Sequence, residues 1–273
     1  MTNADVYRIT DQLDDATLDV LVTRLEIRAQ HPRVVPMIDD YLNAMQIDQA
    51  QRVLDLGCGT GVIARRIARR PNFSGHVLGV DLSDYLIRAA NGFAQKEGLA
   101  DRVEFRTGDS QLLTLPDAAF DAIVIHTMVS HVNDVDSVVR HCARMLAPGG
   151  VIALFDGDYA SMTFGGDDVT QGRKIDEAII GAIATQPRIM RQLPEVLHSA
   201  GLKIVRTFAY VLEDMGRADY WGPAIQSFRA LLPKSGNMSA EQANAWADQM
   251  DKRSEQGTFF GACNFYTYVV QRS

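Results

Sequence analysis

The chain has 273 residues and a formal net charge of -7, and 47% of its residues are hydrophobic. These values are typical of one large globular domain, or a domain with a small appendage, that needs no disulfide or metal to hold it together. The negative charge argues against a nucleic-acid partner, because such proteins normally carry a basic surface.

The N-terminus and the cysteines bear on location. Residues 1–12 lack the basic start and apolar stretch of a signal peptide, and apolar runs elsewhere are too short to cross a bilayer. Cys58, Cys142 and Cys263 are odd in number and lack the spacing of metal ligands. We therefore expect a reduced, cytoplasmic protein with no membrane span and no bound metal.

Helices are predicted first along the chain. Residues 16–28 and 35–45 have helical patterns, and Pro32 and Pro36 mark the break between them. We assign residues 1–48 to an N-terminal helical segment.

Between residues 51 and 155, runs rich in Val, Ile and Leu alternate with stretches whose apolar residues recur every three or four positions. The runs predict strands buried on both faces, and the alternation predicts βαβ units of a doubly wound, mostly parallel α/β sheet. The expected strands are 52–56, 76–80, 103–107, 122–126 and 151–155, and the expected helices are 62–70, 85–97 and 135–146.

The pattern changes after residue 155, where residues 156–168 are rich in Gly, Asp, Ser and Tyr. Helical patterns follow near 175–180 and 194–200, and residues 202–212 and 259–270 predict two more strands. We assign residues 49–273 to a second domain with helical insertions at about 158–200 and 213–256. Trp221 and Phe228 in the later insertion fit either packing against the main domain or a cap over a substrate pocket.

A glycine-rich turn links the first strand of this domain to its helix, with Gly57, Gly59 and Gly61 in the turn. Glycines allow a tight turn and close approach of a ligand, and the helix N-terminus offers free N–H groups. The dinucleotide fingerprint needs a third glycine where this chain has Val62 or Ala64. The spacing thus disfavours a nicotinamide cofactor without excluding it.

Carboxylates follow or end three of the predicted strands. Asp55 lies two residues before the first glycine, Asp81 ends the second strand, and Asp109 follows the third. Ligands of doubly wound sheets bind at the carboxyl ends of the strands, so the three acids should meet in one crevice. Asp81 suits two ribose hydroxyls, since Ser83 already provides the next helix with a cap, whereas Asp109 also suits a turn.

These motifs together resemble those of class I S-adenosylmethionine-dependent methyltransferases, and most of all the branch similar to ubiquinone- and menaquinone-biosynthesis methyltransferases. The resemblance rests on residues 53–61, 79–83, 108–110, 120–131 and 146–150, and is strong over about residues 50–157. It implies a Rossmann-like, seven-stranded sheet whose last strand is antiparallel. It also implies S-adenosylmethionine as cofactor and S-adenosylhomocysteine as product. The cofactor-binding residues that it implies are Asp55, Gly57, Gly59, Thr60, Gly61, Asp81, Leu82, Asp109, Ser110 and His126.

The acceptor side is expected at the loop after the fourth strand. His131 is the candidate base, because histidine titrates near neutral pH, and a hydrogen bond within the loop is the alternative explanation. Tyr159 is a second candidate catalytic residue. Candidate substrate contacts are Arg24, Met128, Asp156 and Asp158; for Arg24, pairing on the helix face near Glu26 is an alternative.

We therefore expect methyl transfer to a small or medium organic acceptor by in-line displacement, with C- or O-methylation favoured. The loop lacks the Asn/Asp-Pro-Pro-aromatic motif that many N-methyltransferases carry. Alternatives are a catalytically silent S-adenosylmethionine-binding accessory protein and, less favoured, a nicotinamide-dependent oxidoreductase. The expected partner is a small-molecule substrate, and a homodimer is possible.

Overall fold

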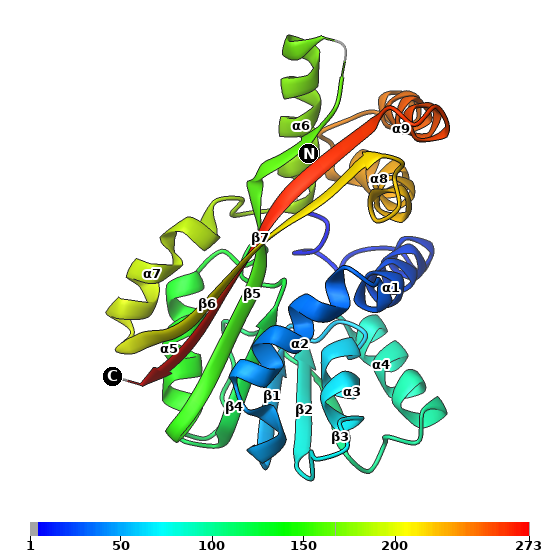
Figure 1. The fold of residues 1–273 in the computed structure, drawn as a ribbon. Helices are drawn as coiled ribbons and strands as arrows, with labels where there is room; N and C mark the ends of the chain where they lie inside the picture. Colours follow the sequence, from blue (N-terminus) through cyan, green and yellow to red (C-terminus); the bar gives the residue numbers. More distant parts are fainter. Residues whose placement is uncertain (1–4, 167, 273) are drawn as a thin grey trace.

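The computed structural model describes residues 5–166 and 168–272, and its centre is one seven-stranded sheet (Figure 1). The strand order is β3-β2-β1-β4-β5-β7-β6, and β7 alone runs antiparallel to its neighbours β5 and β6. This is the predicted Rossmann-like methyltransferase fold. The strands are β1 (Arg52–Leu56), β2 (His76–Asp81), β3 (Val103–Thr107), β4 (Phe120–His126), β5 (Leu146–Phe164), β6 (Leu202–Gly216) and β7 (Phe259–Arg272).

Helices cover both faces of the sheet, and alternate strand residues pack against them. Val53 of β1 packs in a core with α2, α3 and α4, whereas Leu54 packs in a second core with α5 and α7. Burial on both faces explains why these strands are continuous apolar runs. The helices are α1 (Asp15–Gln30), α2 (Val34–Ala44), α3 (Val62–Ala68), α4 (Asp84–Lys96), α5 (Val135–Met145), α6 (Val169–Ile183), α7 (Ile189–Ser199), α8 (Trp221–Ser235) and α9 (Ala240–Glu255).

Strand β5 is much longer than the sequence pattern predicts. It continues to Phe164, because residues Asp156 to Asp158 pair with Tyr266 to Asn264 of β7. A register shift before Thr163 accommodates the extra residues, as β-bulges do. The prediction of an insertion starting at 158 is therefore wrong, since polar and small residues remain in a strand that has a long antiparallel partner.

The long parts of β5, β6 and β7 project past the parallel strands and lead to α6, α8 and α9 (Figure 1). Trp221 of α8 and Trp246 of α9 both pack edge-on against Phe164, at 5.3 Å between ring centroids. The three rings belong to the same core as β1 and α2. The insertion helices therefore share the main core.

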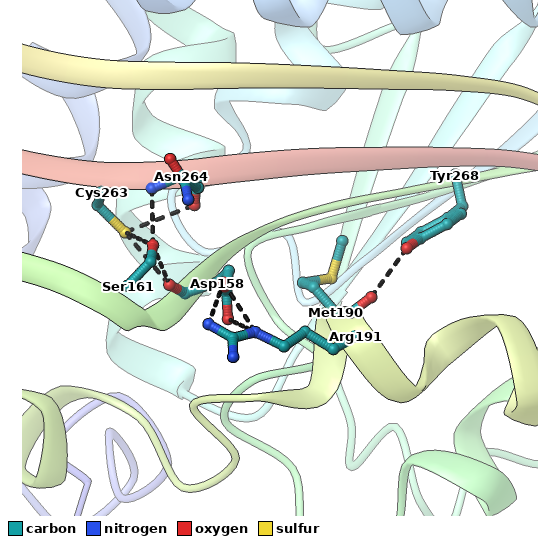
Figure 2. A network of polar contacts seen from close by, with 7 residues as sticks. All are labelled: Asp158, Ser161, Met190, Arg191, Cys263, Asn264 and Tyr268. Atoms are coloured by element: carbon teal, nitrogen blue, oxygen red, sulfur yellow. Dashed lines mark hydrogen bonds and ion pairs between the residues drawn. The ribbon is translucent and has the colours of Figure 1, made fainter.

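Helix α7 begins five residues before the predicted start, and Pro194 lies inside it. A proline there has no N–H for the carbonyl four residues earlier, which belongs to Met190. The Tyr268 hydroxyl of β7 donates to that carbonyl at 2.9 Å, as Figure 2 shows. The tertiary contact replaces the missing helical bond.

No helix in the described part of the chain is long and apolar enough to cross a membrane.

Candidate functional site

A cavity of about 1120 Å³, including its open mouth, lies at the carboxyl ends of β1, β2 and β4. Nine of the ten predicted cofactor residues line it, and Gly61 does not. The N-terminal segment and α1 close the other side. Further lining residues, from these elements and from the loop after β4, are Tyr7, Arg8, Thr10, Leu25, Arg28, Thr127, Met128 and His131.

The glycine turn forms the cavity floor, and its three glycines all have positive φ (73°, 53° and 75°). A side chain at Gly57 would place its Cβ 2.5 Å from Met128. Gly61 caps α3, and a Cβ there would lie 2.4 Å from the Phe105 ring. Gly57 is thus required at the cavity and Gly61 for packing behind it.

Asp55 lies at the end of β1 and is 1% exposed. One carboxylate oxygen accepts from the Ala64 N–H at 3.0 Å, while the buried Oδ1 has no hydrogen-bond partner among the described residues. Burial raises the pKa of Asp55 to about 7. A buried oxygen without a donor is costly, so its place in the cavity wall fits a ligand that brings a donor such as an ammonium group.

Asp81 and Asp109 combine turn-forming bonds with exposure to the cavity. Asp81 accepts from the N–H groups of Gly59 and Ser83 at 2.8 and 3.0 Å, and burial raises its pKa. Asp109 accepts from the Gln111 N–H at 2.8 Å, the bond that its turn-forming alternative requires. Leu82 between these loops is 37% exposed at the cavity, as a residue packing on a planar ring would be.

A second cavity, of about 570 Å³, adjoins the first. The residues common to the two walls are Tyr7, Leu25, Arg28, Thr127 and His131. Aromatic side chains dominate the rest of its lining, among them Tyr159, Tyr220, Trp221, Phe228 and Phe265. The predicted packing of the insertion is observed, and the packed residues Trp221 and Phe228 also line this cavity.

His131 lies in the wall between the two cavities and is paired with Asp5. Its Nδ1 is 2.9 Å from Asp5 Oδ2, and Thr185 donates to the same oxygen through its N–H and its hydroxyl. Burial alone would lower the pKa of His131, but the charge and hydrogen bond of Asp5 outweigh it and raise the pKa. Burial alone would raise the pKa of Asp5, but the charge and hydrogen bond of His131, together with the other hydrogen bonds to Asp5, lower it. Asp5 is therefore an acceptor, so Nδ1 carries a proton and Nε2 is the basic nitrogen.

Two arginines of α1 face the second cavity. Arg24 donates to the Tyr220 hydroxyl at 3.2 Å, and Arg28 donates to the Thr127 hydroxyl at 3.1 Å. The alternative pairing near Glu26 is not observed, since Glu26 binds Arg65 and Thr60 instead, each at 2.6 Å. Thr127 has φ of 51°, a strained conformation for a β-branched residue that is found mainly at functional sites.

Asp156 and Asp158 line neither of these two cavities, so the structure does not place them as substrate contacts. Asp156 is fully buried and accepts from the N–H groups of Ser130 and Gly157, which fixes the loop that carries His131. Asp158 forms a two-oxygen ion pair with Arg191 of α7, shown in Figure 2 beside the Ser161 and Cys263 contacts. The prediction rested on two acidic residues at the end of the fifth predicted strand. Both carboxylates are instead bound to other groups within the protein.

The other predicted residues reach the cavities. Met128 lines the first, and Arg24 and Tyr159 line the second. Burial raises the pKa of Tyr159 well above its ordinary value, so this phenol is a donor and not a base near neutral pH. His126 binds the Tyr41 hydroxyl at 3.0 Å and stacks on Phe155, and burial lowers its pKa well below the usual range.

Comparison with known proteins identifies the domain. Residues 53–150 match the family model described as "Methyltransferase domain". This part of the chain carries a methyltransferase domain. The match begins in β1 and ends in β5, so the family region contains the glycine turn, Asp81, Asp109 and His131.

Relatives of the methyltransferase domain have diverse names. A sterol 24-C-methyltransferase, ERG6B, of Gibberella zeae is 28% identical over 217 residues, 78% of this chain and 56% of that protein. The 27-O-demethylrifamycin SV methyltransferase of Amycolatopsis mediterranei is 34% identical over 143 residues, 52% of this chain and 47% of its own. The crystal structure of the [4+2]-cyclase SpnF has a TM-score of 0.63 at 20% identity, covering 99% of this chain and 98% of that one. The chain thus spans about half the length of these two curated relatives.

The sequence patterns did not indicate Asp5 or Tyr7 as site residues. The family match starts at residue 53, and the first twelve residues have no periodic pattern. Only the folded chain brings this segment to His131.

Among the described residues no group of three or more His, Cys, Asp or Glu side chains is placed to hold a metal ion.

Proposed function

We propose that this chain transfers a methyl group from S-adenosylmethionine to an oxygen or carbon atom of a small or medium organic acceptor held in the second cavity. The observation that carries the proposal is the position of His131. It lies in the wall common to the nucleotide-type cavity and the aromatic one, with its basic nitrogen set by Asp5. The sterol C-methyltransferase and the rifamycin-type methyltransferase among the relatives support this acceptor class.

The residues of the first cavity fit the donor. Asp81 would hold the ribose hydroxyls, Leu82 would pack on the adenine, and Asp109 would accept from its amino group. The unpartnered oxygen of Asp55 would accept from the methionine ammonium directly or through water, and Arg28 would face the methionine carboxylate. The donor supplies a methyl group on a positively charged sulfur.

The acceptor-side residues then have three tasks: alignment, exclusion of water and proton removal. The aromatic wall excludes water and orients the acceptor. His131 takes the acceptor proton at Nε2, and Asp5 stabilises the imidazolium that forms. Asp156 positions this residue by holding the backbone of the loop at Ser130.

A second candidate function is a non-methylating reaction or cofactor-binding role on the same fold. The likeness to a [4+2]-cyclase favours it, because that protein shares this fold over nearly the whole chain. In that case donor binding would persist without methyl transfer. The two functions therefore differ in product and not in cofactor affinity.

The donor proposal is tested by calorimetry with S-adenosylhomocysteine and NADH on the wild type and Asp81→Ala. We expect binding of S-adenosylhomocysteine only, and at least tenfold weaker binding in Asp81→Ala, because two charge-assisted hydrogen bonds are lost. Asp101→Ala, at an exposed aspartate, is the control. Unchanged affinity in a folded Asp81→Ala variant would contradict the assignment.

Transfer of labelled methyl groups to a set of phenols, enols and alcohols tests the reaction, and binding without any transfer would favour the second function.

A further inference from the structure

We propose that the second cavity selects an organic anion: an apolar, ring-bearing acceptor whose negatively charged group pairs with Arg24. This inference rests on the proposed function, because it names the acceptor class of the same site. Its evidence is separate, since it comes from a buried cation and not from the cofactor motifs.

Arg24 is buried without a carboxylate partner. It is 7% exposed, and within the described chain its guanidinium makes one hydrogen bond, to the neutral Tyr220 hydroxyl. The Tyr220 ring lies 5.1 Å from the guanidinium carbon, which adds a cation–π contact. An arginine has five N–H donors, so most of its hydrogen-bonding capacity is left for another group.

Arg65 shows how this fold treats a buried arginine elsewhere. Arg65 is 2% exposed and pairs with both Glu26 and Glu97. The two arginines are similarly buried, but only Arg65 is neutralised. A buried charge without a partner costs several kcal/mol, so its retention in a cavity wall is best explained by a ligand of opposite charge.

The rest of the cavity supports an anion with an apolar body. No Asp or Glu of the described chain lines this cavity, and none forms an ion pair with Arg24. Tyr159, Trp221 and Phe265 provide aromatic surfaces for planar or extended carbon skeletons. Arg24 lines only the second cavity, whereas His131 lines both cavities. The charged end of the acceptor would therefore lie away from the donor, and the atom that receives the methyl group would lie next to the donor.

The test uses two dyes with the same rings. 8-Anilinonaphthalene-1-sulfonate is an anion, and N-phenyl-1-naphthylamine lacks the sulfonate. Both are titrated by fluorescence into protein loaded with S-adenosylhomocysteine, which occupies the first cavity. We expect the sulfonate to bind at least tenfold more tightly than the neutral dye. Arg24→Gln should abolish this preference and Arg24→Lys should keep most of it, because lysine retains the charge.

Arg106→Gln is the matched control, since Arg106 is an exposed residue of β3 and the change removes the same charge. Equal binding of the dyes, binding of neither dye, or a preference that survives in Arg24→Gln would overturn the proposal. So would a similar loss in Arg106→Gln, because net charge would then explain it. If S-adenosylhomocysteine does not bind, the donor proposal fails, and the same titrations on the free protein still decide the role of Arg24.

Discussion

Individual residues in this site serve the fold and the expected ligands at once. Asp81 closes the glycine turn through two N–H groups while facing the cavity, and Asp55 caps α3 with one oxygen and leaves the other without a donor. Asp5 does the same for the acceptor side, because it binds Thr185 and orients His131. Each of these carboxylates therefore stabilises the fold through some of its hydrogen bonds. Each also presents an oxygen atom or its charge to the expected ligand or to His131.

The pH dependence of turnover is expected to report the Asp5–His131 pair. A base works when unprotonated, and Asp5 raises the pKa of His131, so activity should rise with pH through a value above 6.5. In Asp5→Asn this limb should move to lower pH, because the charge that stabilises the protonated form is gone. His131→Ala should lower kcat by about 10²- to 10⁴-fold.

These rates are measured with an acceptor from the transfer set, and an NMR titration of His131 gives the same shift without an acceptor. His76→Ala, at an exposed histidine, is the control. An acid limb that is identical in the wild type and Asp5→Asn would contradict a role for Asp5 in setting the base.

At the scale of elements, helix α1 covers one side of the first cavity and is hydrogen-bonded to the glycine turn. Glu26 of α1 accepts from Thr60 in the turn and from Arg65 of α3, and Leu25 and Arg28 on the same helix line the first cavity. A helix outside the matched family region thus completes the cofactor site. Glu26 is one of its anchors, because it contacts both the turn and the helix behind it.

Glu26→Gln is therefore expected to loosen α1. The loss of a charge-assisted bond to a buried arginine should cost about 2 kcal/mol of stability and weaken S-adenosylhomocysteine binding. Hydrogen exchange of the α1 amides should become faster, and ligand should slow it less than in the wild type. Asp19→Asn serves as control, since Asp19 of α1 contacts only the exposed Tyr85 hydroxyl among the hydrogen bonds described. Unchanged exchange in Glu26→Gln would show that other contacts hold the helix.

At the scale of the whole molecule, the insertions and the parallel sheet form one core. Trp221 is 2% exposed, donates from its ring to the Leu212 carbonyl at 3.3 Å and packs on Phe164. The same residue lines the second cavity, so acceptor binding and folding depend on the same side chains. We infer that the insertions unfold together with the parallel sheet.

Trp221→Ala should lower the free energy of unfolding by about 3 to 5 kcal/mol, the usual cost of a large cavity in a core. Urea unfolding followed by circular dichroism and by the fluorescence of Trp221 and Trp246, which both lie in the insertion, should give one coincident transition in the wild type. Val169→Ala, at a residue that is 72% exposed, should change stability by less than about 0.5 kcal/mol. Two separate transitions would mean that the insertions fold independently.

The amino-acid sequence by itself determined the sheet, the glycine turn and the acids at the strand ends. These features are local: apolar runs recur along residues 50–157, a glycine-rich turn follows the first of these strands, and carboxylates end or follow three of them. Except for β5, element bounds agreed within a few residues there, because each strand and helix is specified by its own pattern.

Only the tertiary structure decided which polar groups remain free. Asp156 and Asp158 have the residue type and strand position of substrate contacts, yet one holds a loop and the other pairs with Arg191. Conversely, Asp5 has no distinctive local pattern, yet it reaches His131 across 126 positions. The availability of a charge depends on partners far away in the chain, and spacing along the sequence carries no information about them.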